Sequence, residues 1–307
     1  MPEPRLEYVM CASPAGTHRM AYWEWGDPGN RDVLLCVHGL TRTGRDFDEV
    51  AKRLQHRFRV VCPDVVGRGK SDWLVNPAGY AVPQYVADML TLIARLNPVR
   101  LDWLGTSMGG LIALGLAGVL AMSAVQRPDR GAFGLPAQQT IRFNRLVLND
   151  VGPQLNIAGL SRIVEYVGKS PQFDNFAQAV EYVRSVSEGF GQHSPEQWEQ
   201  LTRYVFNRQG DHWIKHYDVR MAEPMALQNE ASVAAAELVL WAAYQSIDAP
   251  ILLIRGQQSD LLSPETAAEM LARNPHASMV EFPDVGHAPT LLVDEQIEPI
   301  RQFLLAA

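Results

Sequence analysis

The sequence lacks the features that mark several classes of protein. Its 307 residues contain only three cysteines, Cys11, Cys36 and Cys62, and no CxxC or Cys/His spacing. Neither a disulfide framework nor a cysteine-based metal site is therefore expected, and we predict buried, inert thiols. The formal net charge of −7 and the pI near 5.6 provide no general positive field, so a nucleic-acid partner is not expected.

Long apolar runs are also missing. The opening MPEPRLEYVM has neither the charged nor the apolar region of a secretory signal, and no run reaches the length that spans a bilayer. These absences predict a cytoplasmic protein without a membrane partner. They leave its oligomeric state open.

What the sequence does contain is a series of short apolar runs rich in β-branched residues. Their near-continuous apolar character is typical of strands that are covered on both faces, which predicts a mostly parallel sheet. The expected strands are 19–25, 32–39, 58–64, 100–107, 145–150, 250–256 and 277–283.

Segments with helical periodicity lie between these runs. They are 46–55, 83–96, 109–124, 263–274 and 294–305, and several open with Ser, Asp or Pro. Alternation of strand and helix predicts an α/β fold in which helices flank the central sheet.

The alternation stops between Gly152 and Ile247. This region shows no convincing strand but several stretches of helical period, so we predict an inserted helical lid over 152–247. Residues 1–151 and 248–307 would form the α/β core. A second irregular stretch, 126–140, is rich in Gly and Pro and predicts a long surface loop.

The segment LDWLGTSMGG places Ser107 where an expected strand gives way to an expected helix. A serine at such a turn has a strained backbone, and the crowding of strand and helix requires neighbours without Cβ, which Gly105 and Gly109 supply. This context is the one in which G-x-S-x-G forms a nucleophile elbow. Ser107 is therefore the predicted nucleophile.

A serine hydroxyl needs a general base and a carboxylate that orients this base. Asp260 in RGQQSDLLS and His287 in FPDVGHAPTLL each follow an expected strand, in the order Ser, acid, His. Both residues should therefore emerge at the same sheet edge as Ser107. We predict Asp260 as the acid and His287 as the base.

An oxyanion hole requires two donors near the nucleophile. The amide of Met108 opens the helix after Ser107, and the His38-Gly39 turn can direct the amide of Leu40 into the same space. Leu40 and Met108 are the predicted donors.

Five motifs together resemble the α/β-hydrolase superfamily. They are VHGLTRTG, PDVVGRGKSD, GTSMGG, RGQQSDLL and VGHAPTLL, in the order that the family has them. The resemblance covers nearly the whole chain and implies the α/β-hydrolase fold, with Ser107 as nucleophile, Asp260 as acid and His287 as base. Asp150 is a rival for the acid, because some relatives take their carboxylate from the strand end that it occupies.

Two departures from relatives argue against haloalkane dehalogenase and epoxide hydrolase activity. Haloalkane dehalogenases and epoxide hydrolases of this superfamily carry aspartate at the elbow and His-Gly-x-Pro at the oxyanion turn, whereas this chain has Ser107 and Thr41. RLVLNDVGP and GDHWIKHYDVR are similar to bacterial hydrolases described as esterases, some of which act on aliphatic polyesters.

The expected lid is rich in aromatic side chains, some of which should face the cleft and favour an apolar acyl or alcohol group. Candidates for substrate contact are His38, Arg42, Trp213 and His216, and Arg42 or Arg45 could bind a carboxylate. The pair His212 and His216 lacks the glutamate that zinc-binding hydrolase helices carry between their histidines. No metal and no cofactor are expected.

These observations predict a serine hydrolase that cleaves carboxylic esters through a Ser-His-Asp triad and an acyl-enzyme. The substrate would be a small or oligomeric ester, of apolar or aliphatic character. Two alternatives stay open: a carbon–carbon bond hydrolase of ring-cleavage diketones, and a low-turnover ligand receptor on the same fold.

Overall fold

A computed structural model describes residues 3–125, 141–154 and 163–306. The surface loop predicted at 126–140 lies outside the described residues, as do residues 155–162 of the predicted insertion. All elements below belong to the described parts of the chain.

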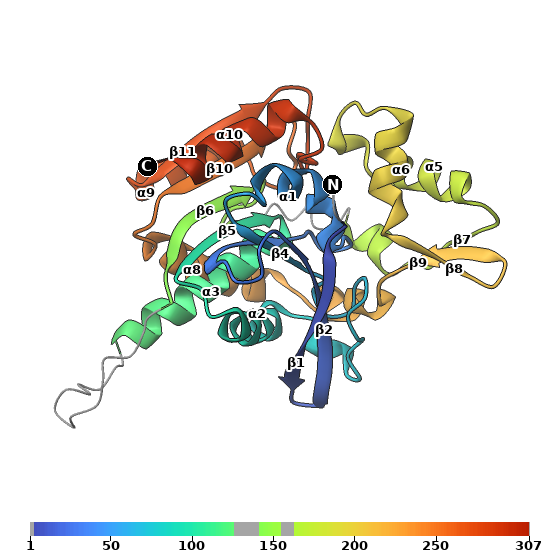
Figure 1. Cartoon of the computed structure of the whole chain (residues 1–307), viewed down its shortest axis with the longest axis horizontal. Helices are drawn as coiled ribbons and strands as arrows, with labels where there is room; N and C mark the ends of the chain where they lie inside the picture. Colours follow the sequence, from blue (N-terminus) through green and yellow to red (C-terminus); the bar gives the residue numbers. More distant parts are fainter. Residues whose placement is uncertain (1–2, 126–140, 155–162, 307) are drawn as a thin grey trace.

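An eight-stranded sheet forms the centre of the molecule, in the order β1-β2-β4-β3-β5-β6-β10-β11 (Figure 1). β1 and β2 form an antiparallel hairpin and β2 is antiparallel to β4, while the remaining neighbours are parallel. The strands are β1 (Arg5–Ser13), β2 (Gly16–Trp25), β3 (Asp32–Val37), β4 (Arg59–Pro63), β5 (Arg100–Thr106), β6 (Phe143–Asn149), β10 (Ile251–Gly256) and β11 (Ala277–Phe282). The mostly parallel sheet predicted from the sequence is confirmed.

Helices cover both faces of this sheet. α2, α3 and α8 lie on one face, and α1 and α10 lie on the other (Figure 1). The helices are α1 (Asp48–Leu54), α2 (Val82–Leu96), α3 (Met108–Val125), α8 (Glu230–Gln245), α9 (Pro264–Arg273) and α10 (Asp294–Leu305). The layered α/β architecture expected from the sequence is therefore present.

The side chains of adjacent residues in the central strands lie in two different hydrophobic cores, one on each face of the sheet. Leu35 and Trp103 belong to the core beneath α2 and α3, whereas their neighbours Leu34 and Leu104 belong to the core beneath α1 and α10. Side chains alternate across a strand, so both faces of β3 and β5 are apolar and buried. This explains why the central strands have continuous apolar sequences.

The region between β6 and β10 differs from its prediction. It contains helices, but also a small sheet in the order β7-β9-β8, which the sequence analysis did not predict. Its elements are β7 (Gln172–Phe173), α5 (Phe176–Val186), 3-10 helix η4 (Glu188–Phe190), α6 (Pro195–Arg203), β8 (Phe206–Gln209), β9 (His212–Lys215), 3-10 helix η5 (Val219–Met221) and α7 (Ala222–Ala226). α5, α6 and β7–β9 lie together beside the main sheet (Figure 1).

α8 lies apart from this group. It packs against α3, and the Tyr244 hydroxyl donates a hydrogen bond to the Met270 carbonyl of α9. α8 therefore belongs to the helical layer that covers the main sheet, although the predicted insertion extends to residue 247.

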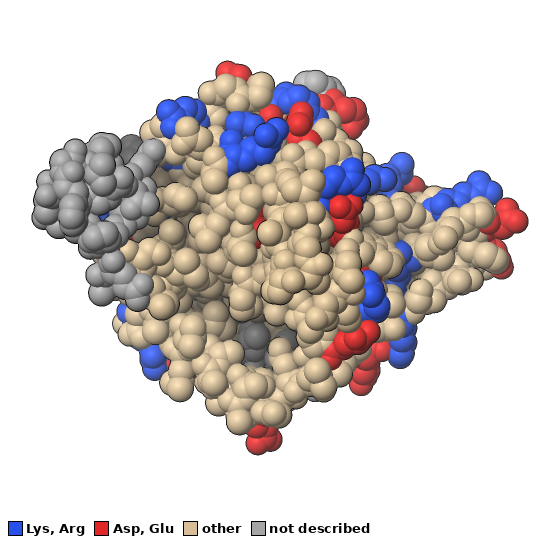
Figure 2. Space-filling model, turned by 90° about the horizontal axis from the view of Figure 1, so that it is seen from below, with Lys and Arg blue, Asp and Glu red and all other residues tan. Residues whose placement is uncertain are grey.

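Charged side chains of both signs lie mainly toward the rim of the face seen in Figure 2, around a broad area without them. This view looks from the side of α2 and α3. Across the described residues, no helix combines the length and the apolar character needed to cross a bilayer.

Candidate active site

Ser107 lies at a sharp turn between β5 and α3. Its φ of 51° is in the left-handed region, where residues with a Cβ are strained. Its amide donates to the Asn149 carbonyl of β6 at 2.9 Å, and its carbonyl accepts from the Gly110 amide at 2.8 Å. The backbone therefore holds the strained residue from both sides.

The two glycines beside Ser107 permit a close approach of β5, α3 and β3. A Cβ on Gly105 would lie 2.5 Å from the backbone of Gly109, and a Cβ on Gly109 would lie 1.9 Å from the Val37 carbonyl oxygen. These are backbone contacts, which cannot move aside as a flexible side chain can. The spacing of the glycines thus has the steric reason that the sequence suggested.

His287 follows β11 and is brought together with Ser107. The distance from its Nε2 to the Ser107 Oγ is 2.9 Å. Asn149 holds the histidine loop, because its Nδ2 donates to the Pro289 carbonyl at 2.9 Å. On the other side, the Gly286 amide donates to the Gly189 carbonyl of η4 at 2.6 Å.

The carboxylate behind His287 is that of Asp150, which corrects the prediction of Asp260. Asp150 Oδ2 lies 2.8 Å from His287 Nδ1, and the Asp150 side chain is fully buried. It also accepts from the Gly256 amide at 3.0 Å and from the Ser259 hydroxyl at 2.7 Å. Since a carboxylate only accepts, the proton of the imidazole belongs on Nδ1, and Nε2 is left to accept from Ser107.

Sheet order explains this correction. β6 lies between β5 and β10, so the residue after β6 is next to the serine turn. Asp150 has a φ of 58°, and this left-handed conformation ends β6. From the loop after β10, Ser259 contacts the Asp150 carboxylate, whereas Asp260, the next residue, is exposed.

The predicted oxyanion donors lie on two sides of Ser107. Met108 directly follows the serine and begins α3, so its amide is one of the helical N–H groups without an intrahelical acceptor. Leu40 lies in the turn after β3 and lines the same cavity as Ser107. Met108 is thus adjacent to the serine, and Leu40 lines the cavity that the serine faces.

Arg68, in the loop after β4, connects the two predicted donors. Its buried guanidinium donates to the Leu40 carbonyl at 2.8 Å and lies 3.5 Å from the Met108 sulfur. It also donates to the Val66 carbonyl and the Tyr85 hydroxyl. Arg68 lies in the motif PDVVGRGKSD, but the sequence alone indicates no role for it, because its partners come from separate elements.

His38, a candidate for substrate contact, lies outside the described lining of the cavity. It is fully buried, its Nδ1 donates to the Gly39 carbonyl at 2.6 Å, and its Nε2 accepts from the Val65 amide at 2.9 Å. Burial lowers the pKa of His38 to about 3, so the ring stays neutral. It fixes the turn that carries Leu40.

A cavity of about 100 Å³ opens over Ser107 and His287. One side, which we call the core side, consists of residues 39–42, 46–47, 106–107 and 287–290. The other, the insertion side, comes from residues between 163 and 217. Aromatic residues of the predicted lid that line this side are Tyr166, Tyr182, Phe190, Phe206 and Tyr217.

Known proteins resemble this chain in both sequence and structure. The sequence model of the alpha/beta hydrolase family matches residues 34–300. A 3-hydroxybutyrate-oligomer hydrolase from Cupriavidus necator is 50% identical over 308 residues, which cover 99% of each chain. The crystal structure of an alpha/beta hydrolase from Novosphingobium aromaticivorans superposes with a TM-score of 0.80, at 32% identity over 99% of both chains.

The chain belongs to the alpha/beta hydrolase family. The predicted fold is therefore confirmed, and so is the predicted class of enzyme, a hydrolase of carboxylic esters.

Of the remaining candidates for substrate contact, the hydrolase brings only Arg42 to the cavity. Arg42 already binds Asp46 through two hydrogen bonds of 2.7 Å. Arg45, the other candidate for binding a carboxylate, is paired with Asp48 at 2.7 Å.

Trp213 and His216 lie outside the described lining of the cavity. The Trp213 ring packs against Phe176, with ring centroids 4.9 Å apart. Burial is the main cause that lowers the pKa of His216 to about 4, with the nearby Lys70 as a second cause. The described lining of the cavity thus does not include these two candidates: Trp213 lies in β9 and packs within the insertion, and His216 directly follows that strand.

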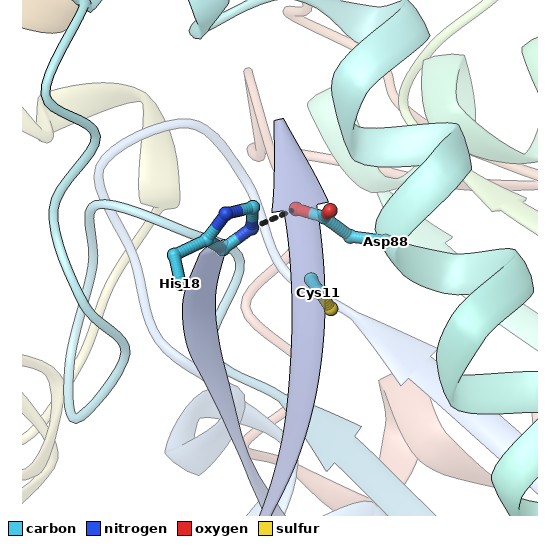
Figure 3. A group of neighbouring side chains, drawn as sticks. All are labelled: Cys11, His18 and Asp88. Carbon is cyan, nitrogen blue, oxygen red and sulfur yellow. Dashed lines mark hydrogen bonds and ion pairs between the residues drawn. The ribbon is translucent and has the colours of Figure 1, made fainter. Parts of the chain in front are cut away.

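The hydrolase also contains a buried polar cluster away from the active site, formed by Cys11, His18 and Asp88 (Figure 3). The His18 Nε2 lies 3.0 Å from an Asp88 oxygen, and the other oxygen accepts from Gln84 at 2.8 Å. Burial, reinforced by Asp88, raises the pKa of Cys11 to about 12. The cluster joins the β1–β2 hairpin to α2, with Cys11 as the buried thiol expected from the sequence.

Proposed function

We propose that this hydrolase cleaves ester bonds in short 3-hydroxybutyrate oligomers through a serine acyl-enzyme. The observation that carries this proposal is the hydrogen-bonded series Ser107–His287–Asp150 at the cavity. The substrate class is supported by the relative from Cupriavidus necator, whose name states that activity. A cavity of about 100 Å³ is smaller than the roughly 300–1,000 Å³ typical of drug-sized ligands, which suits a short acyl unit.

In the first half-reaction, the Ser107 Oγ attacks the ester carbonyl carbon while His287 Nε2 takes the hydroxyl proton. The carbonyl π electrons move onto its oxygen, and the amides of Leu40 and Met108 are the proposed donors to this oxyanion. Collapse of the intermediate breaks the bond to the alcohol. His287 then returns its proton to the leaving alkoxide, and Asp150 stabilises the transient imidazolium.

In the second half-reaction, water attacks the acyl-serine as His287 accepts its proton. Collapse breaks the bond to Ser107 Oγ, which regains the proton from His287, and the acid product leaves. These steps balance without a metal ion or an organic cofactor.

Residues 152–247 are proposed to act as a lid, as the sequence predicted. Support comes from the insertion side of the cavity, which supplies the wall above the core side. The packing of α8 against α3 favours an end of this lid before Glu230. A cytoplasmic location stays a prediction.

The proposal is tested with the dimer and trimer of 3-hydroxybutyrate. Wild type should release 3-hydroxybutyrate over many turnovers, and Ser107→Ala should lower kcat about a million-fold. Ser123→Ala, which alters an exposed serine of α3, serves as the matched control and should behave as wild type.

Three outcomes would contradict the proposal. A Ser107→Ala enzyme that keeps a tenth of the rate would exclude the serine as nucleophile. Cleavage of a ring-cleavage diketone without cleavage of the oligomers would favour the carbon–carbon bond hydrolase. Binding of oligomers without multiple turnover would favour a receptor.

A further inference from the structure

The insertion side of the cavity contains a buried amino group. Lys215 of β9 is only 6% exposed and lines the cavity. Its Nζ donates to the Tyr166 carbonyl at 2.7 Å, which uses one of the three donors of an ammonium group. Within the described part of the chain, no carboxylate forms an ion pair with Lys215.

Aromatic rings surround this ammonium. The ring centroids of Tyr166, Tyr182 and Tyr217 lie 5.9, 5.3 and 5.1 Å from Nζ. At such distances the rings attract a cation, but they cannot accept its remaining hydrogen bonds as an oxygen does. The environment thus retains the charge near the cavity without neutralising it.

A second donor lies beside the first. Tyr182 lines the same cavity, and its hydroxyl is buried without a hydrogen-bond partner among the described residues. An unpartnered buried hydroxyl is unfavourable. One ligand with two oxygens could satisfy both Tyr182 and Lys215.

The cationic groups of the core side are different. Arg42 of the core side, and Arg45 just beyond the described lining, are each bound through two nitrogens to an aspartate of their own segment. Their charge is therefore already balanced, whereas that of Lys215 is not.

We propose that Lys215 and Tyr182 bind the free terminal carboxylate of the substrate, so that the hydrolase selects oligomers that end in an acid. This inference rests on the proposed function and adds to it the group that the insertion side recognises. The carboxylate would accept charge-assisted hydrogen bonds from the ammonium and a hydrogen bond from the phenol.

The pair should be sensitive to alkaline pH. Burial, reinforced by Lys169, lowers the pKa of Lys215 to about 8. Burial raises the pKa of both Tyr182 and Tyr217, so these hydroxyls stay neutral where Lys215 titrates. Lysine is charged below its pKa, and selection of the acid should therefore weaken as the pH rises through 8.

The test compares the 3-hydroxybutyrate dimer with the same dimer whose terminal carboxylate is replaced by a primary amide. The measured quantity is the ratio of kcat/KM for the acid over that for the amide. Wild type should favour the acid about tenfold or more at pH 7, mainly through KM. The ratio should decline toward one by pH 9.

Lys215→Met should bring the ratio to about one, and Tyr182→Phe should lower it several-fold while Lys215 keeps its charge. Lys70→Met, at an exposed lysine outside the described lining of the cavity, is the matched control and should keep the wild-type ratio. Thermal unfolding of each variant checks that it folds.

An unchanged ratio in a folded Lys215→Met enzyme would overturn the inference, as would an equal loss on both substrates. If that variant does not fold, an unchanged ratio in Tyr182→Phe together with a wild-type ratio that ignores pH would overturn it. These outcomes differ from failure of the proposed function, in which wild type cleaves neither dimer.

Discussion

The two sides of the cavity are built differently. On the core side, His287 bonds to Ser107 and to the buried Asp150 behind it, and backbone amides hold Asp150 and the serine turn. On the insertion side, Lys215 is buried without an acidic partner among the described residues. The Tyr182 hydroxyl is buried there without a hydrogen-bond partner among them.

This difference assigns separate tasks to the two sides. Preorganised groups act best on charge that develops during the reaction, since they need no rearrangement. Donors without internal partners gain most when a ligand supplies the missing acceptor. Changes to the core side should therefore lower turnover on every ester, whereas changes to the insertion side should alter the choice among esters.

After loss of the nucleophile itself, the largest effect in this comparison is expected at Asp150. Asp150→Asn should lower kcat about ten-thousand-fold on acid and amide dimers alike, because the amide no longer holds the imidazole in the required tautomer. Asp260→Asn is the matched control. Since Asp260 is exposed, its kcat should stay within about twofold of wild type.

Steady-state kinetics on both dimers measures this pair of variants. If Asp260→Asn caused the larger loss, the arrangement of the core side described above would be contradicted. A loss in Asp150→Asn that affected only the acid dimer would place Asp150 in selection rather than in chemistry.

A smaller effect, on the stability of the folded protein, is expected from the titration of His38 in acid. The pKa of His38 is about 3 in the folded protein, because burial disfavours the charged ring, and about 6.5 in an unfolded chain. The unfolded chain therefore binds the proton first as the pH falls, and stability present above pH 6.5 is lost toward pH 3. At pH 5 this loss is about 2 kcal/mol.

Urea unfolding at pH 7 and pH 5 measures this loss. His38→Gln cannot titrate at this position. Between pH 7 and pH 5 its free energy of unfolding should therefore fall by about 2 kcal/mol less than that of wild type. Equal pH dependence in the two proteins would mean that His38 is protonated in the folded state.

The sheet was predictable because its strands obey one strong constraint. Burial on both faces makes most residues of β3, β5, β6 and β10 apolar, which the sequence shows directly. β1 was not predicted, because its residues alternate between exposed and buried positions and include charged and polar side chains.

The insertion was harder to predict. Its strands β7, β8 and β9 are short and partly exposed, so their apolar pattern is weak. One signal was available: Gly210-Asp211 connects β8 to β9, and Gly210 has a φ of 59°. A two-residue Gly-Asp connection between β-prone segments is typical of a hairpin.

The choice between Asp150 and Asp260 could not be settled from the sequence. Both follow strands whose carboxyl ends face the same sheet edge, and both precede apolar residues. What separates them is the order β5-β6-β10 and the burial of one carboxylate. These properties depend on how distant segments pair.

The most direct test of the central claim is whether Asp150 acts through His287. The measurement is kcat of the double variant Asp150→Asn/His287→Ala beside that of His287→Ala alone, on the 3-hydroxybutyrate dimer. Residues that act as a unit are not additive, so the two values should agree within a few-fold. A further loss of about ten-thousand-fold in the double variant would show that Asp150 acts independently of His287 and would contradict this account.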